Sequence, residues 1–208
     1  MHNPLFRRAI IILLAGLVLL GGALAGALWL RQSPDHRDGM MGEAAIGGPF
    51  ELVDQNGEPF TDQDLEGHYS LVFFGYTYCP DFCPQTLLTV TEALDQLAEE
   101  EPEKADAVVP VFITVDPERD TVEAMNAYAQ HFHESLVALT GSEEQIAETA
   151  RAYRVFYRKV EEDSYNDYLM DHSTFVFLMG PDGKYVTHFT HGTAPEAIAA
   201  ALDERVAG

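Results

Sequence analysis

Cys79 and Cys83 are the only two cysteines in this chain of 208 residues, and each is followed by a proline. They stand in the segment YTYCPDFCP, directly after the uncharged apolar run at residues 71–75. Cysteines at this spacing can form a local disulfide, act as a redox dithiol or supply two thiolates to a metal. A disulfide that closes so short a loop removes little chain entropy, which argues against a purely structural bridge. The pair therefore predicts redox chemistry, metal binding or both.

The prolines indicate where each thiol lies. Pro84 cannot sit inside a helix that begins at Cys79, because its ring would clash with the carbonyl group four residues earlier. It fits the first helical position, which places Cys83 at the N-terminus of a helix and Cys79 in the preceding loop. The positive end of the helix dipole favours a thiolate. We expect both thiols at the carboxyl end of a central parallel strand, where open α/β sheets bind ligands.

A metal held by these thiolates requires a third ligand, and the sequence has eight histidines from which to choose. His131 and His133 end a predicted helix and are expected to be solvated. His172 opens the apolar segment STFVFLM after an acidic stretch, in the region where thioredoxin-like folds face their active-site cysteines. Two sulfurs and one imidazole suit Cu(I), or Cu(II) with an added water or carboxylate. Catalytic zinc uses a similar set with one water, so zinc stays open on spacing alone.

Strands alternate with helices from residue 44 onward. Continuous apolar runs such as 71–75 and 108–115 are typical of buried parallel strands. The order predicts an α/β, thioredoxin-like fold with a central mixed sheet flanked by helices. The expected strands are 50–53, the residues around 60, 71–75, 108–115, 136–139, 175–179 and 185–189, and the expected helices are 85–100, 121–131, 142–153 and 193–206.

The first part of the chain predicts a membrane anchor. Residues 9–30 carry no charge, and a helix of that length spans roughly 33 Å, enough to cross a bilayer core. We expect a cytoplasmic N-terminus (1–8), a transmembrane signal anchor (9–30), a linker (31–43) and one folded domain (44–208); a cleaved signal peptide is the alternative. No Arg- and Ser-rich transit peptide is evident, which favours a single-pass protein of a bacterial inner membrane with its domain in the periplasm.

The net charge of −22 argues against nucleic acid as a partner, because phosphate backbones require basic contacts. Such acidity is typical of adaptation to a saline exterior, and it can also steer a basic partner or a cation.

Two charged segments adjoin the predicted site. In DPERDT, Asp116 is expected either to support the site or its docking face or to have a structural role, and Arg119 to pair locally. For Asp120 the same supporting role is the alternative, and the expected role of Asp120 or Thr121 is to cap the next helix. The acidic segment 161–171 is predicted to be a solvated loop beside His172 that moves when metal binds.

The chain resembles the Sco/SenC family, the copper-binding, thioredoxin-fold assembly factors of cytochrome c oxidase. The resemblance covers nearly all of residues 46–190 and includes IGGPFELVDQNG, LVFFGYTYCPDFCP, FITVDPERDT and DYLMDHSTFVFLMGPDGKYV. It implies that Cys79, Cys83 and His172 bind copper, and that a single N-terminal anchor holds the domain outside the cytoplasm. It also implies a partnership with the copper-binding subunit of the oxidase, together with a periplasmic copper donor or thiol reductant.

Three classes of function stay open at this point. The chain can be a copper metallochaperone for the dinuclear copper centre of the oxidase, or a thiol–disulfide oxidoreductase that reduces the cysteines of that subunit through Cys79 and Cys83. The third class is a copper or redox sensor, or a peroxidase-like defence protein. Copper transfer to a subunit whose cysteines are already reduced separates the first class from the second.

Overall fold

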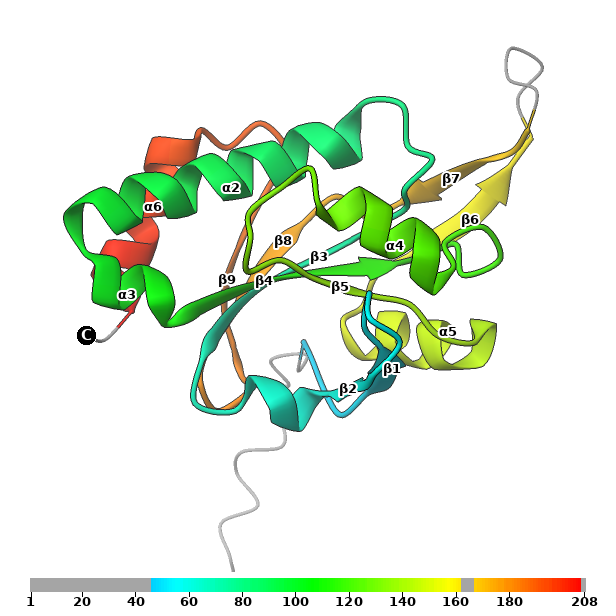
Figure 1. The fold of residues 1–208 in the computed structure, drawn as a ribbon, viewed down its shortest axis with the longest axis horizontal. Helices are drawn as coiled ribbons and strands as arrows, with labels where there is room; N and C mark the ends of the chain where they lie inside the picture. Colours follow the sequence, from blue (N-terminus) through cyan, green and yellow to red (C-terminus); the bar gives the residue numbers. More distant parts are fainter. Residues whose placement is uncertain (1–45, 162–166, 207–208) are drawn as a thin grey trace, which may run out of the picture. The chain divides into compact units, whose positions relative to one another are not determined.

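A five-stranded mixed sheet forms the centre of the protein, seen in a computed structural model that describes residues 46–161 and 167–206 (Figure 1). Three neighbouring strands run parallel to one another. The fourth strand runs antiparallel to the third, and the fifth runs antiparallel to the fourth. This is the α/β, thioredoxin-like arrangement that the sequence predicts. In the order β5-β4-β3-β8-β9, the strands are β5 (Val137–Leu139), β4 (Val108–Thr114), β3 (Tyr69–Gly75), β8 (Val176–Met179) and β9 (Tyr185–Phe189).

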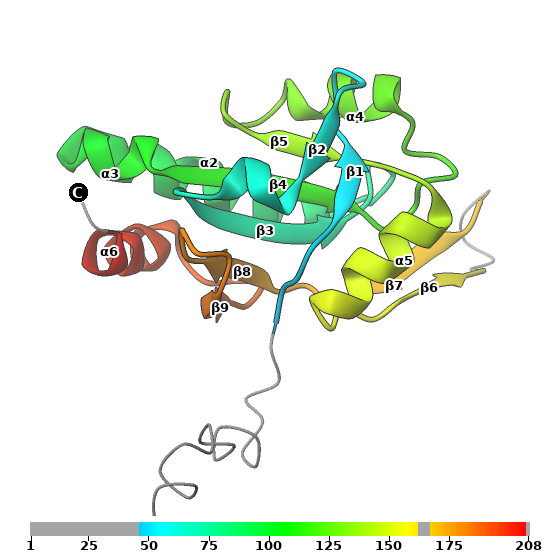
Figure 2. The same cartoon turned by 90° about the horizontal axis from the view of Figure 1, so that it is seen from below.

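Helices cover both faces of this sheet. In Figures 1 and 2, α2, α4 and α6 lie on one face, and α5 lies on the other together with the β1–β2 hairpin. The short α3 follows α2 and leads into β4. The bounds are α2 (Phe82–Glu100), α3 (Pro102–Asp106), α4 (Val122–Ala129), α5 (Glu143–Ala152), α6 (Pro195–Arg205), β1 (Glu51–Val53), β2 (Pro59–Thr61) and the 3-10 helix η2 (Asp62–Leu65).

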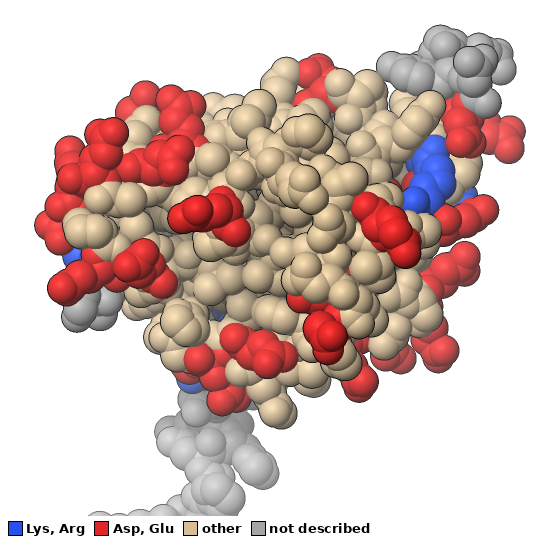
Figure 3. Space-filling view, in the orientation of Figure 1, with Lys and Arg blue, Asp and Glu red and all other residues tan. Residues whose placement is uncertain are grey.

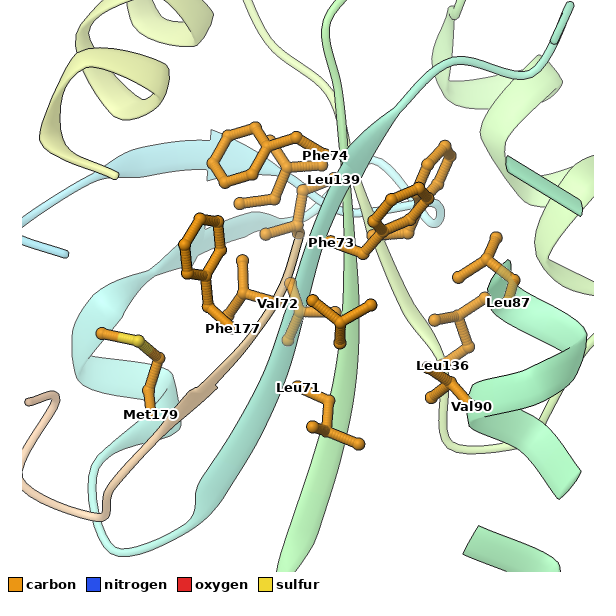
Figure 4. Packing of buried hydrophobic residues seen from close by; sticks show 14 of the residues in the cluster. Leu71, Val72, Phe73, Phe74, Leu87, Val90, Leu136, Leu139, Phe177 and Met179 are labelled. Atoms are coloured by element: carbon orange, nitrogen blue, oxygen red, sulfur yellow. The ribbon is translucent and has the colours of Figure 1, made fainter. Parts of the chain in front are cut away.

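The apolar run of β3 is buried on both faces, as expected for a central strand between two helical layers. Successive side chains of a strand point to opposite faces. Phe73 therefore stacks on Phe112 at a ring-centroid distance of 6.0 Å, on the face that α2 covers. Phe74 packs on Tyr153, at the end of α5, at 5.3 Å. Figure 4 shows the two phenylalanines on opposite sides of the strand, so β3 joins both halves of the core.

A second hairpin, β6 (Tyr157–Val160) and β7 (Leu169–His172), forms a two-stranded sheet of its own. It projects beyond the main sheet in both ribbon views. The predicted loop over 161–171 is wrong at residues 169–171, which belong to β7, and His172 does not open the following strand. His172 ends β7 and pairs with Tyr157 of β6. Short strands with exposed charged residues lack the apolar runs that reveal core strands.

Several predicted boundaries shift in the structure. α2 begins at Phe82, so Pro84 is its third residue. The first turn accepts proline because its amides have no partner within the helix. Ser142 caps α5 with Gln145 as predicted. Thr193, however, does not cap α6, whose N-cap is Ala194. Instead, the Thr193 hydroxyl donates to the carbonyl of Thr190.

The predicted cytoplasmic segment (1–8), anchor (9–30) and linker (31–43) lie outside the described residues. Within the described part, no helix has the length and apolar character that crossing a membrane requires.

Candidate metal and dithiol site

The two cysteines lie where β3 ends and α2 begins. Cys83 is in the first turn of α2 and is fully buried, whereas Cys79 lies in the preceding loop and is partly exposed. Both are free thiols. The amide of Cys83 donates a hydrogen bond to the Cys79 sulfur over 3.4 Å. The loop before α2 therefore brings both sulfurs to one place, the carboxyl end of β3, as the sequence predicts.

Gly75, the last residue of β3, makes room for the buried thiol. A Cβ atom at this position would lie 2.8 Å from the Cys83 sulfur and 2.8 Å from the Phe112 ring. Both distances are shorter than van der Waals contact, so any side chain at residue 75 would displace the sulfur or the ring. Glycine is therefore required at this position by close approach.

His172 reaches the thiols from the end of β7. Its Nε2 atom lies 3.4 Å from the Cys83 sulfur, and its Nδ1–H donates to the carbonyl of Ser173 over 2.9 Å. Because a carbonyl oxygen only accepts, Nδ1 carries the hydrogen of this contact, and Nε2 is the ring nitrogen that faces the sulfurs. The ring also makes edge contacts with Phe73 and Tyr76, at centroid distances of 6.1 and 5.9 Å. Aromatic packing and one hydrogen bond thus fix its orientation.

The three predicted ligands are neighbours, yet they do not surround a common point. Among the described residues, no three His, Cys, Asp or Glu side chains are arranged as a preformed metal site. The sulfurs and the imidazole interact with one another instead. Binding one ion through all three would require them to exchange these contacts for bonds to the metal.

The hydrogen bond between the thiols moves their pKa values in opposite directions. The Cys83 side chain lowers the pKa of Cys79 to about 4, with help from His172 and the amides of Asp81 and Cys83, against the opposing effect of burial. The same bond to Cys79, followed by burial, raises the pKa of Cys83. At neutral pH the partly exposed sulfur is therefore the thiolate, and the buried one keeps its proton. Thiolates are the form that attacks disulfides and binds metals.

A groove of about 520 Å³ leads to this site from the surface. One wall is the loop with Cys79 and Phe82, and the other is the β6–β7 hairpin with Arg158 and His172. Phe82 is half-exposed at the rim. Acidic side chains are spread over the face in Figure 3, and the largest basic patch in that view lies toward the β6–β7 end. A small ligand or a partner side chain can therefore reach Cys79 directly.

Asp120 supports the site, which was the alternative to the helix-capping role that the sequence favours for it. The Asp120 carboxylate is fully buried and accepts hydrogen bonds from the Thr77 amide (3.0 Å), the Thr77 hydroxyl and the Thr114 hydroxyl (2.6 Å). It thereby fixes the first residues of the cysteine loop. The predicted cap of α4 is provided by Thr121, whose hydroxyl accepts from Ala124. A buried acid among threonines leaves no periodic signal in the sequence.

Comparison with known proteins gives consistent matches. The SCO1/SenC family matches residues 38–207. The Arabidopsis thaliana mitochondrial protein SCO1 homolog 1 is 46% identical over 148 residues, which are 71% of this chain and 43% of that protein. The match thus covers less than half the length of that relative.

Two solved structures, both with copper bound, share the fold. Arabidopsis thaliana ScoI superposes with a TM-score of 0.72 at 42% identity, over 77% of this chain and 98% of that one. Bradyrhizobium japonicum ScoI gives 0.70 at 44% identity, over 77% and 99%.

Proposed function

The chain belongs to the SCO1/SenC family, and from this membership we propose that it is a copper metallochaperone for the assembly of cytochrome c oxidase. In this proposal copper is the ion that the protein carries, and Cys79, Cys83 and His172 are its ligands. The recipient is the copper-binding subunit of the oxidase, which holds a dinuclear copper centre. The copper-bound states of the two ScoI structures support copper as the cargo.

One observation carries the assignment of ligands: the 3.4 Å contact between the Cys83 sulfur and Nε2 of His172, which are 89 positions apart in the chain. The fold brings a buried thiol and an oriented imidazole together beside a second sulfur. Two sulfurs and one nitrogen form a soft, low-coordinate set that suits Cu(I), and this set lacks the fourth protein ligand of structural zinc.

The chain's own residues suggest a sequence of contacts for transfer. Cys79 is the accessible ligand at the groove, so an incoming thiolate meets it first. Cys83 is buried and would be the last sulfur to release the ion. Stepwise exchange of thiolates keeps the ion bound to sulfur throughout.

A thiol–disulfide oxidoreductase is the second candidate, favoured by the pairing of an accessible sulfur with a buried one. Cys79 would attack a disulfide of the partner and form a mixed disulfide, and Cys83 would then attack Cys79 to release the reduced partner. The two thiols lose two electrons and two protons, and the partner's disulfide gains them as two thiols. An external thiol reductant must restore Cys79 and Cys83 before the next cycle.

We also propose that residues 9–30 anchor the protein in a bacterial inner membrane with the domain in the periplasm. The apolar segment is long enough to span a bilayer. The proposed partners are then periplasmic: the oxidase subunit, a copper donor and a thiol reductant.

Anaerobic titration of the reduced full chain with Cu(I), against a chromophoric competitor, tests the ligand set. We expect one copper per chain, with affinity sharply weakened in the Cys79→Ser, Cys83→Ser and His172→Ala proteins. His133→Ala is the matched control, since His133 hydrogen-bonds to Ser135 and not to the thiols. Equal affinity in the His172→Ala and unsubstituted proteins would remove histidine from the site.

Delivery and reduction are separated with the oxidase subunit itself. Copper-loaded protein is mixed with apo subunit whose cysteines are already reduced. Transfer of copper supports the chaperone, whereas failure of transfer combined with rapid reduction of the oxidised subunit supports the oxidoreductase.

A further inference from the structure

In the part of the chain that the structure describes, the hairpin that bears His172 has no strand pairing with the main sheet. β6 and β7 pair only with each other among the described strands. No ladder of backbone hydrogen bonds therefore fixes the height of His172 above the cysteines. Side-chain contacts must do so: those of His172 itself fix its ring, and those of Tyr168, just before β7, hold the other end of the strand.

Arg119 of the β4–α4 loop holds Tyr168 in three ways. Its guanidinium lies 3.7 Å above the centre of the Tyr168 ring, and its Nη1 donates to the Tyr168 carbonyl over 2.9 Å. Its Nε pairs with the carboxylate of Asp116, and that carboxylate accepts the Tyr168 hydroxyl over 2.8 Å. Asp116 is only 1% exposed, and charge pairs shielded from water hold their geometry better than exposed ones. Ring, backbone and hydroxyl of one tyrosine are thus fixed together.

The same guanidinium also faces the cysteine loop. It lies 4.8 Å from the ring centre of Tyr78 and 5.8 Å from that of Tyr76. Its Nη2 atom is buried without a hydrogen-bond partner within the described ranges, which leaves the aromatic rings as its environment. Arginine stacks on aromatic rings with a flat, delocalised charge that lysine does not have. One side chain therefore contacts both of the segments that supply ligands.

The geometry of β7 carries this attachment to the histidine. Alternate residues of a strand lie on one face, so Tyr168, Met170 and His172 face the same way. Met170 is buried between the other two positions. Tyr168 directly precedes β7, and at about 3.3 Å per residue its position lies roughly 13 Å from that of His172 at the other end of the strand. A displacement at Tyr168 is passed on to His172.

We propose that Arg119 is a positioning residue that sets the imidazole of His172 against the two thiols. This role rests on the proposed copper site. In it, the β4–α4 loop holds both the hairpin that carries His172 and the loop that carries the cysteines. Arg119 and Asp116 hold the hairpin, and Asp120, the next residue after Arg119, holds Thr77 of the cysteine loop. Three residues within five consecutive positions of one loop thereby fix the distance between ligands that lie far apart in the sequence.

The test is a double-mutant cycle on copper affinity in the full chain, with Arg119→Lys and His172→Ala. Arg119→Lys keeps the charge but removes the flat stack and the two-sided hydrogen bonding. We expect it to weaken copper binding about fivefold or more, with almost no further loss when His172 is already alanine. Arg205→Lys is the matched control, since Arg205 forms an exposed pair with Glu204 on α6.

The Cu(II) form gives a readout that a merely structural role would not change. Electron paramagnetic resonance should show weakened nitrogen coupling in Arg119→Lys, while titration of the two thiols stays as in the unsubstituted protein. Tyr168→Phe, which removes only the bond to Asp116, should weaken copper affinity and nitrogen coupling in the same direction by less, and it provides the test if Arg119→Lys does not fold.

The outcomes distinguish a failure of the positioning role of Arg119 from a failure of the proposed ligand set. Equal losses from Arg119→Lys with and without His172 would overturn the positioning role, because the arginine would then act independently of the histidine. Unchanged affinity and nitrogen coupling in Arg119→Lys would overturn it as well. If His172→Ala alone has no effect, it is the proposed ligand set that fails.

Discussion

Replacing Gly75 with alanine tests how tightly the buried thiol is packed. The added Cβ would lie 2.8 Å from the Cys83 sulfur and 2.8 Å from the Phe112 ring, with the Phe73 ring at 3.2 Å. Cys83 and both rings are at most 1% exposed, so none of them can move into solvent. The backbone of Gly75 does not have positive φ, and the expected effect is therefore steric alone.

The size of the effect follows from these distances. An ordinary contact is at least about 3.4 Å, so the sulfur must move by roughly 0.6 Å and the Phe112 ring by as much. Overpacking of this kind costs about 1–3 kcal/mol of unfolding free energy. The Cys83 sulfur would also leave its 3.4 Å contact with His172. Gly75→Ala is thus expected to lower stability and copper affinity together.

Denaturant unfolding and Cu(I) competition, measured on the same preparation, check this prediction. Gly48→Ala is the matched control, because a Cβ there meets only the Ala152 methyl group at 3.5 Å, an ordinary contact. If Gly75→Ala unfolds at the same denaturant concentration as Gly48→Ala and binds copper equally well, the sulfur is not confined as the structure indicates.

Three further predictions concern single residues. Because the pKa of Cys79 is about 4, its alkylation rate should stay constant from about pH 5 to 8. A rate that falls about tenfold for each pH unit by which the pH is lowered would instead indicate an ordinary thiol. Asp120→Ala should lower the unfolding free energy by about 2–4 kcal/mol, since buried donors of Thr77 and Thr114 lose their acceptor; denaturant titration with a loss below about 1 kcal/mol would contradict this. Ser142→Ala should cost about 0.5–2 kcal/mol by the same assay and leave Cu(I) affinity unchanged; an altered affinity would contradict the separation of α5 from the site.

The parts of the site that the sequence predicts are those with local signals. The proline after Cys83 indicates a strand–loop–helix junction, and the structure has this junction with α2 starting at Phe82. His172 was chosen by its place in the fold order and by family resemblance, and it does lie beside the thiols. Its strand was missed because β6 and β7 carry charged residues on their exposed face, without an apolar run.

The supporting contacts were beyond sequence patterns for a different reason. Arg119 does pair locally with Asp116 as predicted. Its stacking on Tyr168, 49 positions later, depends on how the projecting hairpin folds back toward the β4–α4 loop. Periodicity reports burial within one element, and it carries no information about which distant side chains meet. The same holds for Asp120, which forms its bonds with Thr77 across 43 positions.

X-ray absorption of the reduced, copper-loaded full chain measures the ligand set most directly, because it counts sulfur and nitrogen neighbours of the ion. We predict two sulfur neighbours and one nitrogen neighbour, with the nitrogen contribution lost in the His172→Ala protein. A spectrum that is identical in the two proteins, or one that contains no sulfur, would contradict the assignment of Cys79, Cys83 and His172 as the copper ligands.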